Sequence, residues 1–196
     1  MKVYIYGRGL SYWDHDDDYD LSIGVSTVVK ADVHLLMDPL QSYKDCKVAD
    51  KTEFDWYKEN VRKLYCADVD WYIQALRDEI PVEKVSYNTK VQDKKLFTMV
   101  GLKEDWKEDV EKSYYPVGYV GAFPACFLAY QLGASDIVLW GVDMGLDYYT
   151  LDNPKRKAML DLFAQLRVEF DLLQISLMVG NDKSILKEVL PIYKQS

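Results

Sequence analysis

The most constraining feature of the sequence is a helical segment, a glycine and an apolar strand that follow one another around residue 130. Residues 122–132 have the apolar spacing of a helix and end at Gly133, and residues 136–140 (DIVLW) form an apolar run that ends at Gly141. A glycine commonly ends a helix, and a short apolar run between turn signals is typical of a strand buried on both faces. The segment therefore predicts one helix followed by one strand of a parallel sheet.

The rest of the chain repeats this alternation of strands and helices. Apolar runs predict strands at residues 2–6, 21–25, 33–37, 82–87, 96–100 and 174–179. Spacings of three and four residues predict one or two helices over residues 52–80 with a break near residue 67, a helix from Pro154 to about residue 170, and a short helix from Ser184. Residues 106–112 are expected to be polar and exposed. We expect a single α/β domain over residues 1–196, Rossmann-like, with a mostly parallel sheet and helices on both faces.

The composition excludes several classes of protein. The formal net charge of -8, from 32 acidic against 24 basic residues, argues against a bulk nucleic-acid binder. No segment reaches the roughly 18 apolar residues of a membrane helix, and the apolar run at the start is too short for a secretion signal. The three cysteines form no CxxC pair, which disfavours a zinc site or a disulfide framework. The sequence predicts a soluble, cytoplasmic protein without a membrane span.

Small and polar residues stand where the predicted strands and helices reach one edge of the sheet. Ligands of open parallel sheets bind outside the carboxyl ends of the strands, where helix N-termini direct free N–H groups at them. The candidate binding residues at these positions are Gly7, Arg8, Gly9, Ser11, Ser26, Thr27, Asp38, Gly121, Ala122, Asn181 and Ser184. Together they predict a site for a phosphate-bearing ligand.

The first of these turns, Gly7-Arg8-Gly9, has the residue types that a phosphate requires. Two glycines let the backbone approach phosphate oxygens closely, Arg8 can pair with them, and the Ser11 hydroxyl can donate to them. Tyr12 stands at the third glycine position of a dinucleotide fingerprint, which disfavours a nicotinamide cofactor. The alternative is a tight structural turn, and the motif alone does not decide between the two.

Asp143 and His15 are the candidate catalytic residues. Asp143 follows an apolar strand and, with Asp38, could ligate magnesium or manganese or bond a sugar hydroxyl. A capping or turn role is the alternative, above all for Asp38, which precedes a proline. His15 lies near the glycine turn and could act as a base, whereas His34, inside an apolar strand, is expected in the core.

The acidic run around His15 is not expected to bind a metal. Five aspartates lie within residues 14–20, but the run lacks the glycine and the terminal glutamate of a calcium loop. It predicts a solvated loop or a very short helix, and we name no metal ligands there.

Three stretches of the chain resemble a known group of proteins. They are YGRGLS at the start, GAFPACFLAYQLGASDIVLWGVDM in the middle and ISLMVGNDKSILKEVLP near the end. In this order they are similar to the Rossmann-like glycosyltransferase superfamily, which includes the bacterial sialyltransferases of the Campylobacter type and the MptE-like proteins related to 6-hydroxymethylpterin diphosphokinase. The resemblance implies that Gly7, Gly9 and Ser11 lie by nucleotide phosphates, Ser26 by the base or sugar, Gly121 and Ala122 at a helix start that faces the nucleotide, and Asp143 and Ser184 on the rim.

The chain departs from those sialyltransferases at two points. Gly121-Ala122 stands where they have a serine before the glycine of the helix start, and their catalytic histidine beyond the GxD strand has no counterpart, because both histidines precede residue 35. The leading hypothesis is a glycosyltransferase-like enzyme that binds a nucleotide or nucleotide-sugar. A non-catalytic nucleotide-binding or sequestering module and a metal-dependent diphosphokinase of the MptE-like type are the alternatives. A homodimer, and a role as an accessory protein of a phage or mobile element, are compatible with the sequence.

Overall fold

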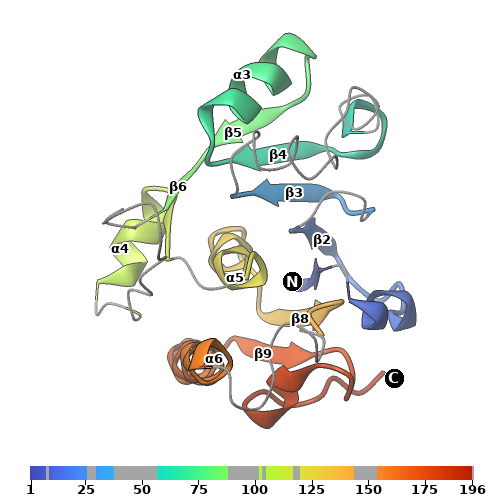
Figure 1. Cartoon of the computed structure of the whole chain (residues 1–196), viewed down its shortest axis with the longest axis vertical. Helices are drawn as coiled ribbons and strands as arrows, with labels where there is room; N and C mark the ends of the chain where they lie inside the picture. The colour runs from blue at the N-terminus through green and yellow to red at the C-terminus, as the bar shows by residue number, and fades with distance from the viewer. Residues whose placement is uncertain are drawn as a thin grey trace.

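The computed structural model has a seven-stranded sheet in which all neighbouring strands are parallel. The structure describes residues 1–7, 9–25, 30–37, 57–87, 102, 105–116, 120–143 and 154–195. From one edge of the sheet to the other, the strands are β5 (Val82–Lys84), β4 (Lys63–Cys66), β3 (Val33–Leu36), β2 (Leu21–Gly24), β1 (Lys2–Tyr6), β8 (Asp136–Trp140) and β9 (Ser176–Val179). Figure 1 shows them stacked in this order.

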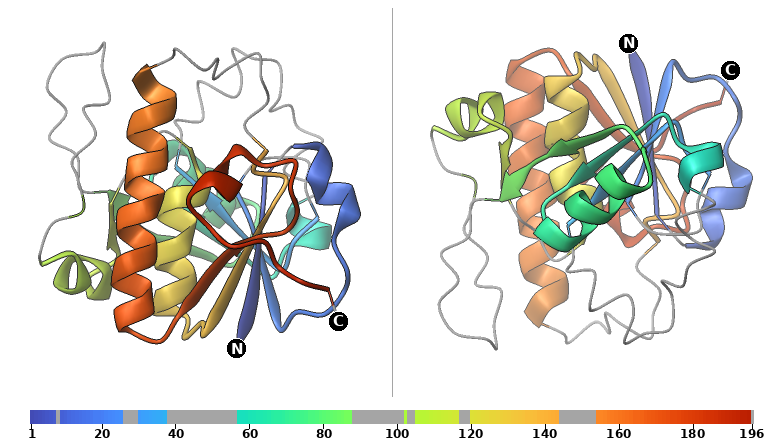
Figure 2. Two further views of the ribbon diagram at one scale, coloured as in Figure 1. Left: turned by 90° about the horizontal axis from the view of Figure 1, so that it is seen from below. Right: turned by 90° about the horizontal axis from the view of Figure 1, so that it is seen from above.

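Two long helices cover one face of the sheet. They are α5 (Ala122–Gln131) and α6 (Pro154–Leu172), which lie side by side in both views of Figure 2. Their side chains interlock through rings, as between Phe123 and Phe163, whose centroids are 5.4 Å apart. The smaller helix α4 (Trp106–Glu111) packs beside them, next to a second, two-stranded parallel sheet of β6 (Ser86–Tyr87) and β7 (Tyr114–Tyr115).

The other face of the sheet is covered in two parts. Helix α3 (Val69–Arg77) packs against β4 and β5. The short helix η1 (Leu10–Asp14) and the chain after a second short helix, η2 (Ile185–Glu188), bring rings against β1 and β8. In Figure 1, η1 and the C-terminus lie on the side of the sheet opposite α5 and α6. The predicted α/β fold, a parallel sheet with helices on both faces, is therefore confirmed.

The two faces of the central strands differ in chemistry. Ile5 pairs in register with Leu139, and both belong to the large apolar core under α5 and α6. One residue further along, Tyr6 pairs with Trp140, and both belong to a smaller cluster on the opposite face. Side chains alternate along a strand, so neighbouring strands in register place the same kind of residue on the same face. In β1 and β8 this gives one face of aliphatic side chains and one face rich in aromatic rings that carry polar atoms.

The predicted helix over residues 52–80 is wrong in its middle part. Residues 63–66 form strand β4, which pairs with β3, and helix structure resumes only with α3. Leu64 and Tyr65 are both buried, on opposite faces of the sheet. A strand that is buried on both faces lacks the alternation of apolar and polar residues, and its apolar residues can then have the same spacing as those of a helix. The start of α3 is fixed by Asp68, whose carboxylate accepts bonds from the N–H groups of Asp70 and Trp71.

The segment 106–112 is also not the exposed stretch that its polarity predicts. It contains α4, in which Trp106 and Val110 are buried one helical turn apart. The Trp106 ring packs edge-on against Phe127 of α5, with centroids 5.3 Å apart. Two apolar residues suffice to bury a short amphipathic helix, whatever the charge of the rest. The strand predicted at 96–100 lies outside the described residues.

The described cysteines are free thiols in the core. Cys66 and Cys126 are buried, and burial raises the pKa of Cys66 to about 12. They are therefore protonated at neutral pH and poor nucleophiles. Cys46 lies outside the described residues.

In the part of the chain that the structure describes, no helix combines the length and the apolar character needed to cross a membrane.

His34 lies in the core, as predicted. Its side chain is fully buried in β3, and its ring meets Tyr57 edge-on at 5.2 Å between centroids. The ring lies over Gly24 of the neighbouring strand, where a Cβ would come within 2.3 Å of it. Burial lowers the pKa of His34 to about 3, because desolvation disfavours the imidazolium form.

His34 is expected to make stability fall in mild acid. Below the ordinary histidine pKa the unfolded chain binds a proton that the folded protein, with its lowered pKa, does not. From about pH 7 to about pH 5 this linkage removes about 2 kcal/mol from the free energy of unfolding. His34→Phe keeps a ring and removes the titration, while the carboxylates remain common to both proteins. Urea unfolding at both pH values should show the extra loss only in the wild type, and equal losses would contradict the assignment.

Candidate functional site

The candidate site lies at the carboxyl ends of β1 and β8, where the strand order changes direction. After β1 the chain continues through η1 to β2 on one side, and after β8 it continues through α6 to β9 on the other side. The two connections run over opposite faces of the sheet, as Figure 1 shows. In open parallel sheets, ligands bind at such a switch point, because the diverging loops leave room between them.

The turns that follow β1 and β8 are in direct backbone contact. The N–H of Gly7 donates to Trp140 O at 2.8 Å, and that of Gly9 donates to Gly141 O at 2.6 Å. A Cβ on Gly7 would lie 2.4 Å from Gly141 O, and Gly141 itself has a φ of +65°. Glycine is therefore required at 7 and 141 by the packing of the turns, so the structural interpretation of the first motif has a physical cause independent of any ligand.

Ser11 and Asp143 join the same two turns through their side chains. The backbone N–H of Ser11 donates to Asp143 Oδ2 at 2.7 Å. The Ser11 hydroxyl donates to Asp143 Oδ1 and accepts from the N–H of Gly141 at 2.8 Å. Ser11 is 2% exposed and Asp143 9%. A Cβ on Gly9 would lie 2.4 Å from Asp143 Oδ2. Both carboxylate oxygens and the hydroxyl are thus already bonded within the protein. We call this contact the Ser11–Asp143 clasp.

The turn after β9 is tied to the same edge. Ser184 donates its hydroxyl to Val142 O at 2.7 Å and accepts from the N–H of Leu186 at 3.2 Å, so it caps η2. Asn181 donates to Asp14 Oδ2 at 2.8 Å, and this bond connects the turn to η1. Of the predicted site residues, Gly7, Gly9, Ser11, Asp143, Asn181 and Ser184 are therefore brought to one edge of the sheet.

The start of α5 reaches this edge beside β2. A Cβ on Gly121 would lie 3.2 Å from Val25 Cβ, and the N–H of Val25 donates to Tyr6 O at 3.0 Å. Gly121 and Ala122 thus lie next to the ends of β2 and β1. The first turn of α5 carries no acidic residue, so the positive end of the helix dipole is not neutralised there. Arg8, Ser26, Thr27 and Asp38 lie outside the described residues.

His15, the candidate base, follows η1 and faces the aromatic cluster. Its Nδ1 lies within hydrogen-bond distance of Tyr12 O. Its ring packs against Tyr6 and Tyr12, at 4.8 and 5.0 Å between centroids, and Trp140 lies further away at 6.4 Å. The ring is half-buried. Its role as a base stays a prediction.

The aspartates around His15 bond to other parts of the protein. Asp14 is paired with Lys183 at 2.5 Å, Asp16 accepts from the Tyr4 hydroxyl at 2.5 Å, and Asp18 is paired with Lys2. Of the two alternatives predicted for this run, the loop describes residues 15–20, which follow η1 and form neither helix nor strand. Among the described residues, no group of three or more His, Cys, Asp or Glu side chains is arranged to hold a metal ion.

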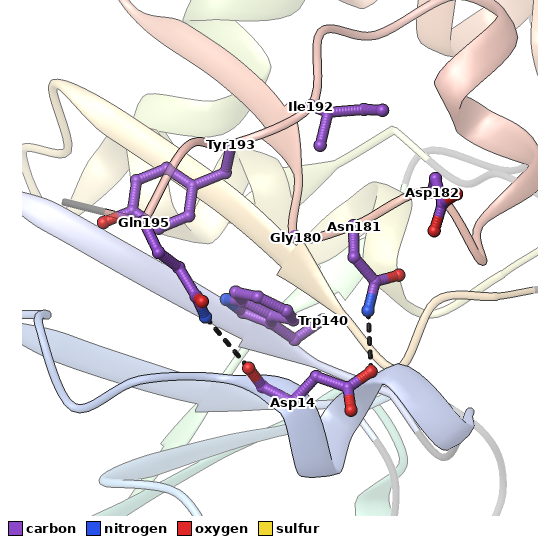
Figure 3. Close-up of a pocket in the computed structure, with 8 residues that line it drawn as sticks. All are labelled: Asp14, Trp140, Gly180, Asn181, Asp182, Ile192, Tyr193 and Gln195. Atoms are coloured by element: carbon purple, nitrogen blue, oxygen red, sulfur yellow. Dashed lines mark hydrogen bonds between the residues drawn. The ribbon is translucent and has the colours of Figure 1, made fainter.

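A pocket of about 290 Å³ opens beside the switch point. Its lining residues are Asp14, Trp140, Gly180, Asn181, Asp182, Ile192, Tyr193 and Gln195, drawn in Figure 3. The C-terminal segment forms one wall, because the N–H of Tyr193 donates to Val179 O of β9 at 2.7 Å. Gly180 lets the Trp140 indole lie flat against the backbone, since a Cβ there would come within 2.2 Å of the ring.

Sequence reasoning missed several residues of this pocket. Trp140 ends an apolar strand, and that position was a signal for the edge of the sheet. Tyr193 and Gln195 have no local signature, because only the return of the chain beside β9 brings them to the pocket. Lys183 was also missed. Its hydrogen bond to Asp14 raises its pKa, and the charges of Asp143 and Asp182 act in the same direction.

Comparison with solved structures identifies the overall arrangement. The sialyltransferase CstII from Campylobacter jejuni, in complex with the substrate analogue CMP-3FNeuAc, matches with a TM-score of 0.54 and 15% identity over 97% of this chain and 85% of CstII. The same protein in complex with cytidine-5'-monophosphate matches with a TM-score of 0.53 and 14% identity over 97% and 84%. No family model matches the chain. No curated protein sequence matches it either.

This likeness confirms the predicted resemblance at the level of the fold. At 14–15% identity it shows that the two proteins share an α/β fold with a parallel sheet, and the likeness ends there. The relation to MptE-like proteins stays a prediction. The roles of the individual site residues likewise stay predictions.

The Ser11–Asp143 clasp is expected to contribute strongly to stability. Ser11→Ala leaves the Gly141 N–H and one Asp143 oxygen without their buried partner, at a cost of about 2–3 kcal/mol in unfolding free energy. Adding Asp143→Ala should cost at least about 1 kcal/mol less than the sum of the single changes. Urea unfolding measures all three variants. Ser135→Ala, at an exposed hydroxyl on the opposite edge, is the control with little effect. Strictly additive costs would show that the two residues are not coupled.

Proposed function

We propose that this chain binds a nucleotide or nucleotide-sugar at the carboxyl ends of β1 and β8 and acts as a glycosyltransferase-like enzyme. The observation that supports the proposal most is the switch point between these strands, with the start of α5 beside it. The fold likeness to a sialyltransferase whose structures contain CMP and a CMP-sugar analogue supports a nucleotide or nucleotide-sugar as the ligand.

The start of α5 is the most suitable place for the phosphates. Its first turn has no carboxylate, and the positive end of a ten-residue helix attracts anions. Arg8, in the turn that precedes η1, would add a cation that pairs with phosphate oxygens. A protein of net charge -8 needs such local groups, because its overall field repels a phosphate.

Asp143 suits a positioning role better than a direct catalytic one. In glycosyl transfer an acceptor hydroxyl attacks the anomeric carbon, its proton passes to a base, and the nucleotide leaves with the bonding electrons. Both oxygens of Asp143 are engaged by Ser11, so this carboxylate holds the turns in place. His15 is then the better candidate for the base.

A non-catalytic nucleotide-binding module is the second candidate function. The engagement of Asp143 by Ser11 favours it, because both oxygens of this carboxylate already accept hydrogen bonds within the protein. The same bonds weigh against a metal-dependent diphosphokinase, which would need Asp143 as an acidic ligand. Turnover separates the candidates: a transferase consumes a nucleotide-sugar, a diphosphokinase consumes ATP with magnesium or manganese, and a binding module consumes neither.

Nucleotides are expected to stabilise the purified protein. At about 100 times its dissociation constant, a nucleotide or nucleotide-sugar should add about 2.7 kcal/mol to the free energy of unfolding. The measurement is a thermal-shift screen of cytidine, uridine, guanosine and adenosine nucleotides and their sugar derivatives, with and without magnesium or manganese. A complete absence of shifts would overturn the proposal.

Arg8→Ala is the variant that locates the site. It should reduce the shift by removing a phosphate-binding cation, whereas Gly9 and Ser11 variants would also break the clasp and confuse binding with folding. Arg77→Ala, which removes an exposed arginine from the last turn of α3, changes the net charge equally and should keep the full shift. Equal losses in both variants would mean that only the net charge matters.

A further inference from the structure

The pocket beneath the C-terminal segment contains a buried hydrogen-bond donor without a partner. Among the described residues, none accepts a bond from the Trp140 indole Nε1, and this atom has no exposed surface. Trp140 as a whole is 1% exposed and forms part of the pocket wall. Figure 3 shows the nitrogen end of the indole on the side of Gln195 and Tyr193. Buried indole N–H groups usually find an acceptor, so this one indicates a missing partner.

The charged groups that line the pocket are both acceptors. Asp14 and Asp182 contribute carboxylates. Lys183, which is not part of the lining, is the cation paired with Asp14, at 2.5 Å. Two negative charges against one positive charge disfavour a phosphate or another anion. A cation would suit the carboxylates, but it offers no lone pair to the indole N–H.

A hydroxyl group fits both sides of this pocket, because it donates to a carboxylate and accepts from an N–H. Tyr193 and Ile192 add apolar surface on the opposite wall, and the Tyr193 ring stands edge-on to Trp140 at 6.4 Å between centroids. The volume of about 290 Å³ lies at the lower end of the range for ligand pockets. These dimensions suit a single ring that carries both hydroxyls and apolar C–H groups.

We propose that this pocket binds one neutral, hydroxyl-bearing sugar ring, with a sugar hydroxyl accepting from Trp140 Nε1. The role of this sugar as the acceptor of a transfer reaction rests on the function proposed above, but its binding does not. Because Trp140 Nε1 is buried, a side chain of the pocket has to move to admit the hydroxyl, and we expect this of Gln195, which donates to Asp14 O at 2.9 Å. Only one described hydrogen bond of that side chain is lost by this movement.

The indole N–H itself reports on the proposal. The chain has five tryptophans, so a ¹H–¹⁵N spectrum resolves their indole signals, and Trp140→Phe identifies the one that belongs to Trp140. Titration of the wild type with the methyl glycosides of glucose and galactose should move this signal saturably. The signal of Trp13, whose residue is 80% exposed, should stay in place. Inorganic phosphate and tetramethylammonium should move neither.

Matched variants test the contact. Trp140→Phe should weaken glycoside binding about tenfold, as expected for one lost hydrogen bond to a buried donor, while Trp13→Phe should leave it unchanged. Gln195→Ala should bind the glycoside more tightly, because no side chain has to be displaced. Saturation-transfer NMR on the glycoside measures each affinity. Should Trp140→Phe fail to fold, contacts of the indole with the Tyr193 ring, 6.4 Å away between centroids, assign the signal, and the wild-type titration still decides.

The outcomes separate this proposal from the proposed function. A glycoside that moves the Trp140 signal without any nucleotide response would support the pocket and overturn the nucleotide site. Nucleotide binding with a Trp140 signal that no glycoside moves would overturn the pocket alone. Movement caused by phosphate or tetramethylammonium instead would also overturn it, because the ligand would then be an ion.

Discussion

The carboxyl edge of the sheet depends on the contact between Ser11 and Asp143. Their two hydrogen bonds, with a third from the Gly141 N–H to the Ser11 hydroxyl, hold the turn after β1 against the turn after β8, and the two strands pair in parallel directly beneath them. This close approach explains why a side chain at 7 or 9 would collide with the opposite turn. A carboxylate that is 9% exposed is tolerated there because its oxygens accept bonds from the opposite turn. The geometry of the candidate site therefore follows from one buried polar contact.

The two faces of the sheet differ in composition: one holds most of the apolar core, and the other carries polar aromatic rings and the pocket. The face under α5 and α6 is aliphatic and aromatic and holds most of the apolar core. The opposite face places Tyr4, Tyr6 and Trp140 beside the acidic residues of the segment after η1. Rings with polar atoms are costly to bury without partners, and Tyr4 finds one in the carboxylate of Asp16. The polar atoms of the Tyr6 and Trp140 side chains have none among the described residues, and Trp140 is the one of the two that lines the pocket.

Much of the fold could be predicted from the sequence, because its signals are local. The run at 136–140, the glycine after α5 and the proline that begins α6 each act within a few residues. β4 could not be recognised, since burial on both faces removes the alternation that identifies a strand. Sequence reasoning identified the strand ends that form the site, but not their pairing. Ser11 and Asp143 are 132 residues apart, and nothing in the sequence indicates that they form hydrogen bonds with each other. Nor does the sequence indicate that Tyr193 lies at the pocket beside the carboxyl ends of the strands.

The charges along this edge also set the direction in which a nucleotide-sugar would lie. Asp143, Asp14 and Asp182 all lie toward β8, β9 and the C-terminal segment, and a phosphate placed among them would be repelled despite Lys183. The start of α5, beside β1 and β2, has no acid in its first turn. Because a donor carries its charge at one end and its hydroxyls at the other, we expect its phosphates over β1 and β2. Its sugar would then point toward β8, the same side as the pocket that suits a neutral sugar ring.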